Sequence, residues 1–215
     1  SFFHLLLSHT VPMSIIYLFT GLSIVIGSIG GLQQIEYRRL IAYSSITHMG
    51  YLTLSATELC SDSTLLIYIL QYTITTVACL FAFNILDTQK NGLISSLKGG
   101  LHLFPATSIT LIALLFSLAG IPPLVGFFAK LDVFYALIAS NSYFILLVAI
   151  ITSGIGAFYY LRLIYLILSD YNPNNTIAIN KSSNQYLLST IFITALFIFL
   201  EGTMLEQTIL LLTSI

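Results

Sequence analysis

Long apolar stretches separated by short polar ones run through the whole sequence. The hydrocarbon core of a bilayer takes about 20 apolar residues per helix, and six segments come close to that length or exceed it. They are predicted as helices over residues 11–31, 39–57, 64–86, 105–140, 143–169 and 187–213. The pattern therefore predicts an all-α, polytopic membrane protein, with residues 1–215 forming a single transmembrane domain.

The fourth segment is interrupted at its middle. The stretch "FSLAGIPPLVGFFAKLDVF", residues 116–134, contains Gly120, Pro122 and Pro123, followed by Lys130. Proline has no N–H, so carbonyls one turn earlier lose their hydrogen-bond donors. Irregular backbone at membrane depth is tolerated where it faces protein or water, and many transporters place ion sites at such breaks. The break is predicted near residues 120–123, either as a packing kink or as part of a polar site.

Composition agrees with a membrane protein. Apolar residues make up 57% of the chain and charged residues only 7%, whereas soluble domains average about 25% charged residues. The net charge of −1 argues against a nucleic-acid partner. Two cysteines, Cys60 and Cys79, do not suggest a metal site or a disulfide framework.

The basic residues predict the orientation of the helices. With six spans, the segments after the first, third and fifth share one side of the membrane. These segments hold Arg38, Arg39, Lys90, Lys98 and Lys181, and the opposite segments, 57–63 and 140–142, hold no Lys or Arg. The asymmetry follows the positive-inside rule. We expect the basic side to face the cytoplasm or the mitochondrial matrix, with the C-terminus on the opposite side.

Lys130 is the one basic residue that lies well inside a predicted span. A charge near the bilayer centre costs about 2.5–3.5 kcal/mol on insertion scales, and packing of an apolar helix does not require it. Either a static ion pair or headgroup contact holds the lysine, or it is an ionisable group in a polar pathway. The second interpretation is favoured, because moving a neighbouring charge can switch such a group between its protonated and neutral states.

The second span carries a polar face of its own. Ser44, His48, Tyr51 and Ser55 are spaced four, three and four residues apart, which places them on one side of a helix. His48 is either a member of a proton wire or a histidine that bonds across a helix contact. A weaker stripe in the third span is interpreted mainly as packing, and consists of Tyr68, Tyr72, Thr75 and Cys79.

Three stretches of the chain resemble a known family. "GSIGGLQQIEYRRLIAYSSITHMGY" (27–51) closely resembles a segment of chain 2 of NADH:ubiquinone oxidoreductase, the antiporter-like membrane subunit of respiratory complex I. "LAGIPPLVGFFAK" (118–130) resembles that family's broken helix with its lysine, and "YYLRLIY" (159–165) is similar to the helix that follows. Their order and spacing match along most of residues 10–170.

The resemblance implies a fold and roles for single residues. Lys130 matches the family's proton-translocating lysine on the discontinuous helix, and His48, Ser44 and Ser45 match the hydrated helix before it. Tyr51 shares the face of His48 and is expected to support the polar pathway. The first five spans resemble the second of two inverted repeats. Because the first repeat is absent, we expect this chain to be a fragment or one product of a split gene.

The function that the resemblance implies is that of the C-terminal half of a proton-pumping complex I subunit, which couples NADH:quinone oxidoreduction to proton translocation. We expect no metal and no redox cofactor in this chain, since FMN, iron–sulfur clusters and ubiquinone would bind elsewhere in the complex. Expected partners are other membrane-arm subunits, a separate chain that supplies the N-terminal half, and membrane lipids.

The expected location is the mitochondrial inner membrane, or alternatively the bacterial inner membrane. Two rival functions stay open: a subunit of an Mrp-type cation/proton antiporter, and a structural membrane subunit that no longer pumps.

Overall fold

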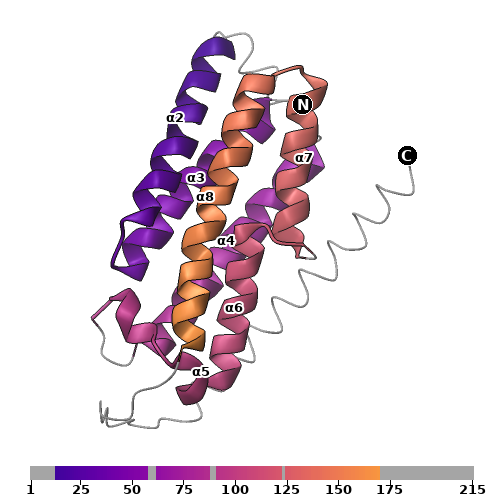
Figure 1. The fold of residues 1–215 in the computed structure, drawn as a ribbon. Coiled ribbons are helices and arrows are strands. Elements are labelled where there is room, and N and C mark those ends of the chain that lie inside the picture. The colour runs from indigo at the N-terminus through magenta and orange to yellow at the C-terminus, as the bar shows by residue number, and fades with distance from the viewer. Residues whose placement is uncertain (1–12, 58–61, 88–90, 123, 170–215) are drawn as a thin grey trace.

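The computed structural model describes residues 13–57, 62–87, 91–122 and 124–169. Every helix and short turn of helix in these ranges belongs to one bundle (Figure 1). The elements are α2 (Met13–Leu32), α3 (Tyr37–Thr57), α4 (Asp62–Leu86), the 3-10 turn η1 (Ile94–Leu97), α5 (Gly100–Leu103), α6 (Pro105–Ala119), α7 (Val125–Ala139) and α8 (Tyr143–Leu168). The bounds of α2, α3, α4 and α8 lie within two residues of the predicted segments. The predicted segment 187–213 lies outside the described residues.

Among the described residues, three helices are long and apolar enough to cross a membrane, over Ser14–Leu32, Tyr68–Leu86 and Tyr143–Leu168. Helix α3 is as long as α2 but far more polar, and it buries much of that polarity. Ser44, His48 and Ser55 are buried, whereas Ile46 and Met49 on the same helix are exposed. Large apolar side chains of α2 and α8, including Phe19 and Phe144, also face outward. This arrangement suits a protein whose surroundings are lipid.

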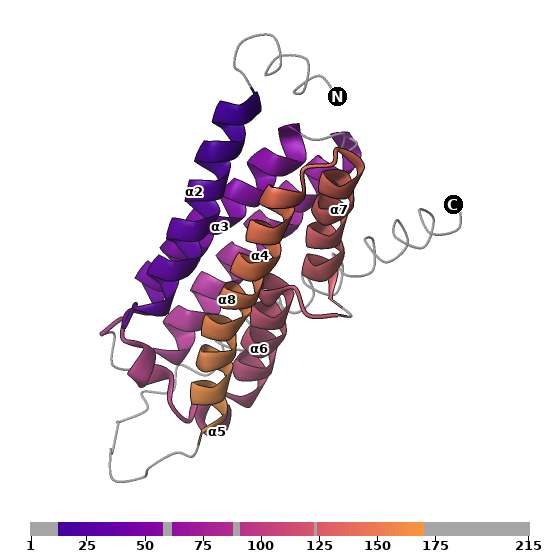
Figure 2. The same ribbon diagram turned by 45° about the horizontal axis from the view of Figure 1, so that its top comes forward.

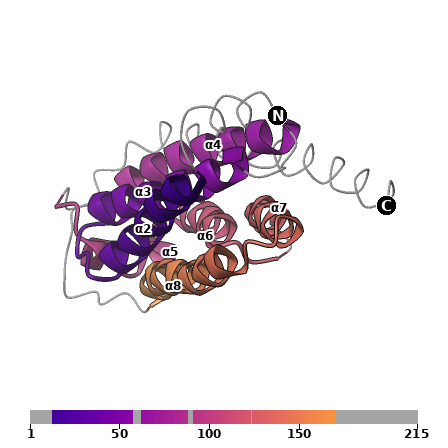
Figure 3. The same cartoon turned by 90° about the horizontal axis from the view of Figure 1, so that it is seen from above.

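The fourth predicted segment forms two helices, α6 and α7, that are separated at the break predicted near residues 120–123. Figures 1 and 2 show α6 and α7 following one another along the long axis of the bundle, with a short non-helical linker between them. Seen from above, α6 lies among the longer helices, and α7 lies to one side of it (Figure 3). Helix α6 packs mainly against α4 and α8, so the break lies inside the bundle.

One end of the bundle gathers the described parts of the first two connectors that the charge pattern assigned to the basic side, whereas Lys90 and Lys181 lie outside the described residues. The connector before α3 pairs with the segment before η1: the N–H of Tyr37 donates to the carbonyl of Gly92 at 3.1 Å, and that of Ile94 to Ile35 at 2.9 Å. Arg162 of α8 reaches the carbonyl of Leu32 at 3.4 Å. The corner between α7 and α8, at residues 140–142, lies at the other end (Figure 1). The connectors therefore lie at the ends that the predicted topology requires.

Candidate functional site

The C-terminus of α6 ends in a glycine cap. Gly120 has φ +78°, and its N–H donates to the carbonyl of Ser117 at 3.1 Å, while the N–H of Ile121 donates to Phe116 at 3.2 Å. This is a Schellman motif, which turns the chain away from the helix axis. A helix end leaves its last four carbonyls without helical donors. The motif satisfies Phe116 and Ser117 and leaves Leu118 and Ala119.

Lys130 supplies the missing donors. Its Nζ lies 3.0 Å from the carbonyl oxygen of Leu118 and 3.0 Å from that of Ala119. Pro122 cannot donate to Leu118 because it has no N–H, and residue 123, also proline in the sequence, lies outside the described residues. Lys130 is 6% exposed. The broken helix thus leaves two carbonyls without donors, and the buried ammonium of Lys130 donates to both of them.

No carboxylate neutralises Lys130 within the described part of the chain. The ion pair found there joins Arg39 to Glu36 at 3.0 Å, on the exposed basic end. Asp132, two residues beyond Lys130, is half-buried and forms no ion pair with it. The static ion pair considered from the sequence is therefore absent from the described residues. The ammonium is held instead by carbonyl dipoles at a helix C-terminus, which carries partial negative charge.

Tyr51 lies next to Lys130, and His48 lies next to Tyr51. The Lys130 Nζ is 5.9 Å from the centre of the Tyr51 ring, within cation–π range. The Tyr51 hydroxyl donates to the carbonyl of Ala149 on α8 at 2.6 Å. The rings of Tyr51 and His48 have centres 6.4 Å apart. Tyr51 of α3 therefore neighbours both Lys130 on α7 and His48 on its own helix.

His48 is enclosed by two tyrosines of α4. Its Nδ1 lies 3.2 Å from the Tyr68 hydroxyl, and its ring stacks on Tyr72 with centres 4.6 Å apart. The stripe that was interpreted mainly as packing thus contributes two direct contacts to His48. The signal in the sequence was the pair of tyrosines four residues apart at the middle of an apolar span.

The two serines of α3 have different surroundings. Ser44 is buried and hydrogen-bonded to the hydroxyl of Tyr160 on α8. Ser45 is half-buried and donates to the carbonyl of Ile41 within its own helix at 2.9 Å. Of the predicted site residues, the structure brings Lys130, Tyr51, His48 and Gly120 together. The two serines lie about one turn before His48 on α3.

Two residues of the site were not predicted from the sequence. Gln71 of α4 and Ser117 of α6 are both buried, and the Gln71 amide donates to the Ser117 hydroxyl at 3.3 Å. The N–H of Gly126, at the start of α7, donates to the same hydroxyl at 3.4 Å. Ser117 thus joins α4, α6 and α7 at the break. An amide inside an apolar span was the available signal for Gln71.

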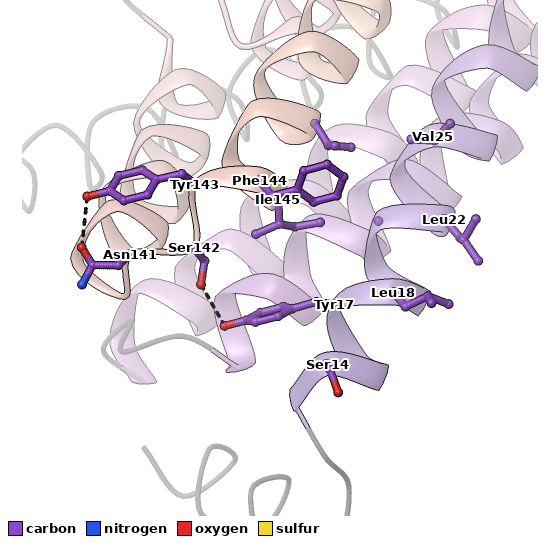
Figure 4. A pocket seen from close by; sticks show the side chains of 12 residues that line it. Ser14, Tyr17, Leu18, Leu22, Val25, Asn141, Ser142, Tyr143, Phe144 and Ile145 are labelled. Carbon is purple, nitrogen blue, oxygen red and sulfur yellow. Dashed lines mark hydrogen bonds between the residues drawn. The ribbon is translucent and has the colours of Figure 1, made fainter.

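The described residues contain no group of three His, Cys, Asp or Glu side chains that could hold a metal ion. A groove of about 630 Å³ opens between α2 and the α7–α8 corner, away from Lys130. Figure 4 shows its polar end, where Ser142 bonds to Tyr17 at 3.3 Å and Tyr143 to Asn141 at 3.0 Å. None of the predicted site residues lines this groove.

Comparison with known proteins gives a consistent result. The family model described as "NADH:quinone oxidoreductase/Mrp antiporter, TM" matches residues 1–156. NADH-ubiquinone oxidoreductase chain 2 of Rhizopus oryzae is 41% identical over 164 residues, which cover 71% of this chain and 31% of that protein. NADH-quinone oxidoreductase subunit N of Pelagibacter ubique is 38% identical over 189 residues, or 82% of this chain and 39% of that protein. The chain thus spans less than half the length of these relatives.

Solved structures share the fold. A chain of respiratory complex I from Thermus thermophilus with bound aureothin matches 92% of this chain and 44% of its own length, with a TM-score of 0.75 and 25% identity. A chain of the Mrp complex from Dietzia sp. matches 73% of this chain and 30% of its own length, with a TM-score of 0.66. At 23% identity, the second match carries information on the fold alone.

Proposed function

The chain belongs to the NADH:quinone oxidoreductase/Mrp antiporter transmembrane family, and we propose that it is the C-terminal portion of a proton-translocating membrane subunit of respiratory complex I. The relatives named as chain 2 and subunit N of the NADH oxidoreductase support this assignment. In this role the subunit couples NADH:quinone oxidoreduction elsewhere in the complex to proton transfer through Lys130.

The observation that carries the proposal is the setting of Lys130. A buried ammonium is held by two carbonyls at a helix break, with no ion-paired carboxylate in the described residues. Dipoles hold a charge less firmly than a permanent countercharge. An approaching charge from a neighbouring subunit can therefore change whether Lys130 keeps its proton. One full cycle, in which Lys130 takes up a proton from one side and releases it to the other, would move one proton between the hydrated interior of the membrane arm and one face of the membrane.

Tyr51 and His48 extend the polar cluster from Lys130 into α3 and α4. We propose that these side chains, with Ser44 and Ser45, support the proton pathway, and that Gly120, Pro122 and Pro123 keep the helix open. The chain is a multi-pass protein of an inner membrane. The mitochondrial inner membrane is the proposed location. Other membrane-arm subunits are the proposed partners, with FMN, iron–sulfur clusters and ubiquinone bound elsewhere in the complex.

Replacing Lys130 with methionine tests the proposal in the assembled complex. Lys130→Met keeps most of the length of the side chain and removes the ionisable group. We expect proton pumping driven by NADH to fall about tenfold, as when a barrier rises by about 1.4 kcal/mol. The measurements are NADH oxidation rate and proton uptake in the same inverted membrane vesicles.

Lys98→Met is the matched control, because Lys98 is exposed on the connector beside η1. It should leave both rates unchanged. If Lys130→Met assembles and pumps at the original rate and proton-to-electron ratio, the lysine has no role in pumping. A structural membrane subunit would then be the better description.

A cation/proton antiporter subunit is the second candidate, supported by the family description and by the fold shared with the Mrp complex. The two functions differ in their driving reaction. Proton flux driven by a sodium or potassium gradient in proteoliposomes, without NADH or quinone, would favour the antiporter. Its absence, together with NADH-dependent pumping, would favour the complex I subunit.

A further inference from the structure

The end of α6 is shaped to receive a small cation. The two carbonyl oxygens that the Schellman motif leaves open, those of Leu118 and Ala119, both point at one position, since each lies 3.0 Å from the same nitrogen. The ring of Tyr51 covers this position from α3. Three electron-rich groups from two elements therefore surround the Lys130 ammonium.

General physics favours a positive ion at this position. A helix C-terminus carries about half a negative charge, and an aromatic face attracts cations most strongly where water is excluded. Interrupted membrane helices use such C-terminal carbonyls to coordinate monovalent cations in many transporters. Here a side chain of the same protein fills the place that a free cation takes in those proteins.

We propose that the C-terminal end of α6 is a binding site for small ammonium ions, with the Lys130 side chain as its built-in occupant. The inference deepens the proposed function, because it gives a ligand class to the site through which the proton would pass. Only the role of the site in proton transfer rests on the proposed function. The binding site itself stands on the contacts of Leu118, Ala119 and Tyr51.

Gly120 leaves room for the occupant. A Cβ at this position would lie 3.0 Å from Cδ and 3.2 Å from Nζ of Lys130. Shortening the lysine to alanine would empty this space and leave two buried carbonyls without donors, which is unfavourable. Methylammonium carries one positive charge, three N–H donors and a single methyl group, so it corresponds to the charged end, Cε and Nζ, of the side chain that the change removes.

The test uses the Lys130→Ala variant in its native membrane complex. Methylammonium chloride should raise the melting temperature of this variant by about 2–4 °C. The control is tetramethylammonium chloride at equal ionic strength, because tetramethylammonium has no N–H donors. The unmodified protein should show no such rise because its ammonium occupies the site, and Lys130→Met should show none because its side chain fills most of the same space. The absence of a rise in Lys130→Ala, or an equal rise in all three proteins, would overturn the inference.

A second comparison holds even if Lys130→Ala does not assemble. Glutamine at position 130 offers two N–H donors to the open carbonyls, and methionine offers none. Lys130→Gln should therefore melt at a higher temperature than Lys130→Met. Equal melting temperatures would show that the carbonyls do not need a donor, which contradicts the proposed site.

Proton pumping separates this inference from the proposed function. It is measured as membrane potential, because permeant amines collapse pH gradients. A rise in melting temperature with methylammonium, without restored pumping in Lys130→Ala, supports the ammonium site and counts against a mobile proton on Lys130. Restored pumping supports both. Without the rise in melting temperature the site is rejected, and Lys130→Met alone then decides the function.

Discussion

At the scale of single residues, the site consists of buried polar groups whose partners come from other helices. Lys130 on α7 contacts carbonyls of α6, and His48 on α3 contacts Tyr68 and Tyr72 of α4. A buried polar group without a partner is costly. Each of these side chains therefore restricts the position of the helix that faces it, as well as offering a group that can exchange protons.

Replacing His48 with phenylalanine separates packing from proton transfer. Phenylalanine can keep the stack on Tyr72, but it leaves the Tyr68 hydroxyl without its partner, which costs about 1–2 kcal/mol of stability. If His48 passes protons, NADH-driven pumping also falls about tenfold. Thermal unfolding and pumping are measured on the same preparation.

The control for this change is His102→Phe, since His102 is exposed on α5. It should alter neither quantity. A His48→Phe variant that loses stability but pumps normally would assign the histidine to helix packing alone.

At the scale of elements, the break depends on close contact between two half-helices. Gly126 at the start of α7 faces the backbone of Ser117 near the end of α6, and a Cβ added to it would overlap the Ser117 carbonyl. Ser117 also receives the Gln71 amide, so α4 is tied to the same point. The angle between α6 and α7 thus depends on the absence of a side chain at Gly126 and on the Ser117 hydroxyl, which receives hydrogen bonds from both α4 and α7.

We expect Gly126→Ala to destabilise the protein by about 3 kcal/mol, because backbone atoms cannot move aside as a flexible side chain can. Gly154→Ala is the matched control: a Cβ there meets nothing within 4 Å, and alanine favours a helix over glycine by about 1 kcal/mol. Thermal unfolding of the complex measures both. Equal stability of the two variants would mean that α6 and α7 approach less closely than described.

At the scale of the whole molecule, the outer surface carries many large apolar side chains, and the buried polar groups lie among the apolar side chains of the core. In the described part of the chain, the connectors that carry Arg38 and Lys98 meet at one end of the bundle, and the α7–α8 corner lies at the other (Figure 1). Arg38 bonds to Asn84 at 3.3 Å and Arg162 to Leu32 at this basic end. The charges thus mark one membrane surface.

Cysteine labelling measures this orientation. Ser95→Cys on η1 and Ala139→Cys at the end of α7 introduce small changes at exposed positions. A membrane-impermeant thiol reagent should label position 95 only from the matrix or cytoplasmic side, and position 139 only from the opposite side. The unmodified chain gives the background. Labelling of both positions from one side would contradict the predicted topology.

The sequence alone determined where the helices lie, where the fourth one breaks and which face of α3 is polar. Local features carry this information: apolar runs of membrane length, prolines that lack a donor, and residues three or four positions apart that share a face. The same features made Lys130 exceptional before any contact was known. They also placed Ser44, His48, Tyr51 and Ser55 on one face of a helix, and the structure shows that all four are buried.

Only the tertiary structure decided which groups meet. Lys130 bonds to carbonyls eleven and twelve residues earlier in the chain. His48 stacks on a tyrosine of another helix, and Gln71 of α4 bonds to Ser117 of α6 at the break. Such contacts depend on how helices rotate and cross when they pack, and residue spacing within one helix carries no information on that. For this reason the sequence identified an unusual lysine, whereas the fold gave it two carbonyls and an aromatic ring.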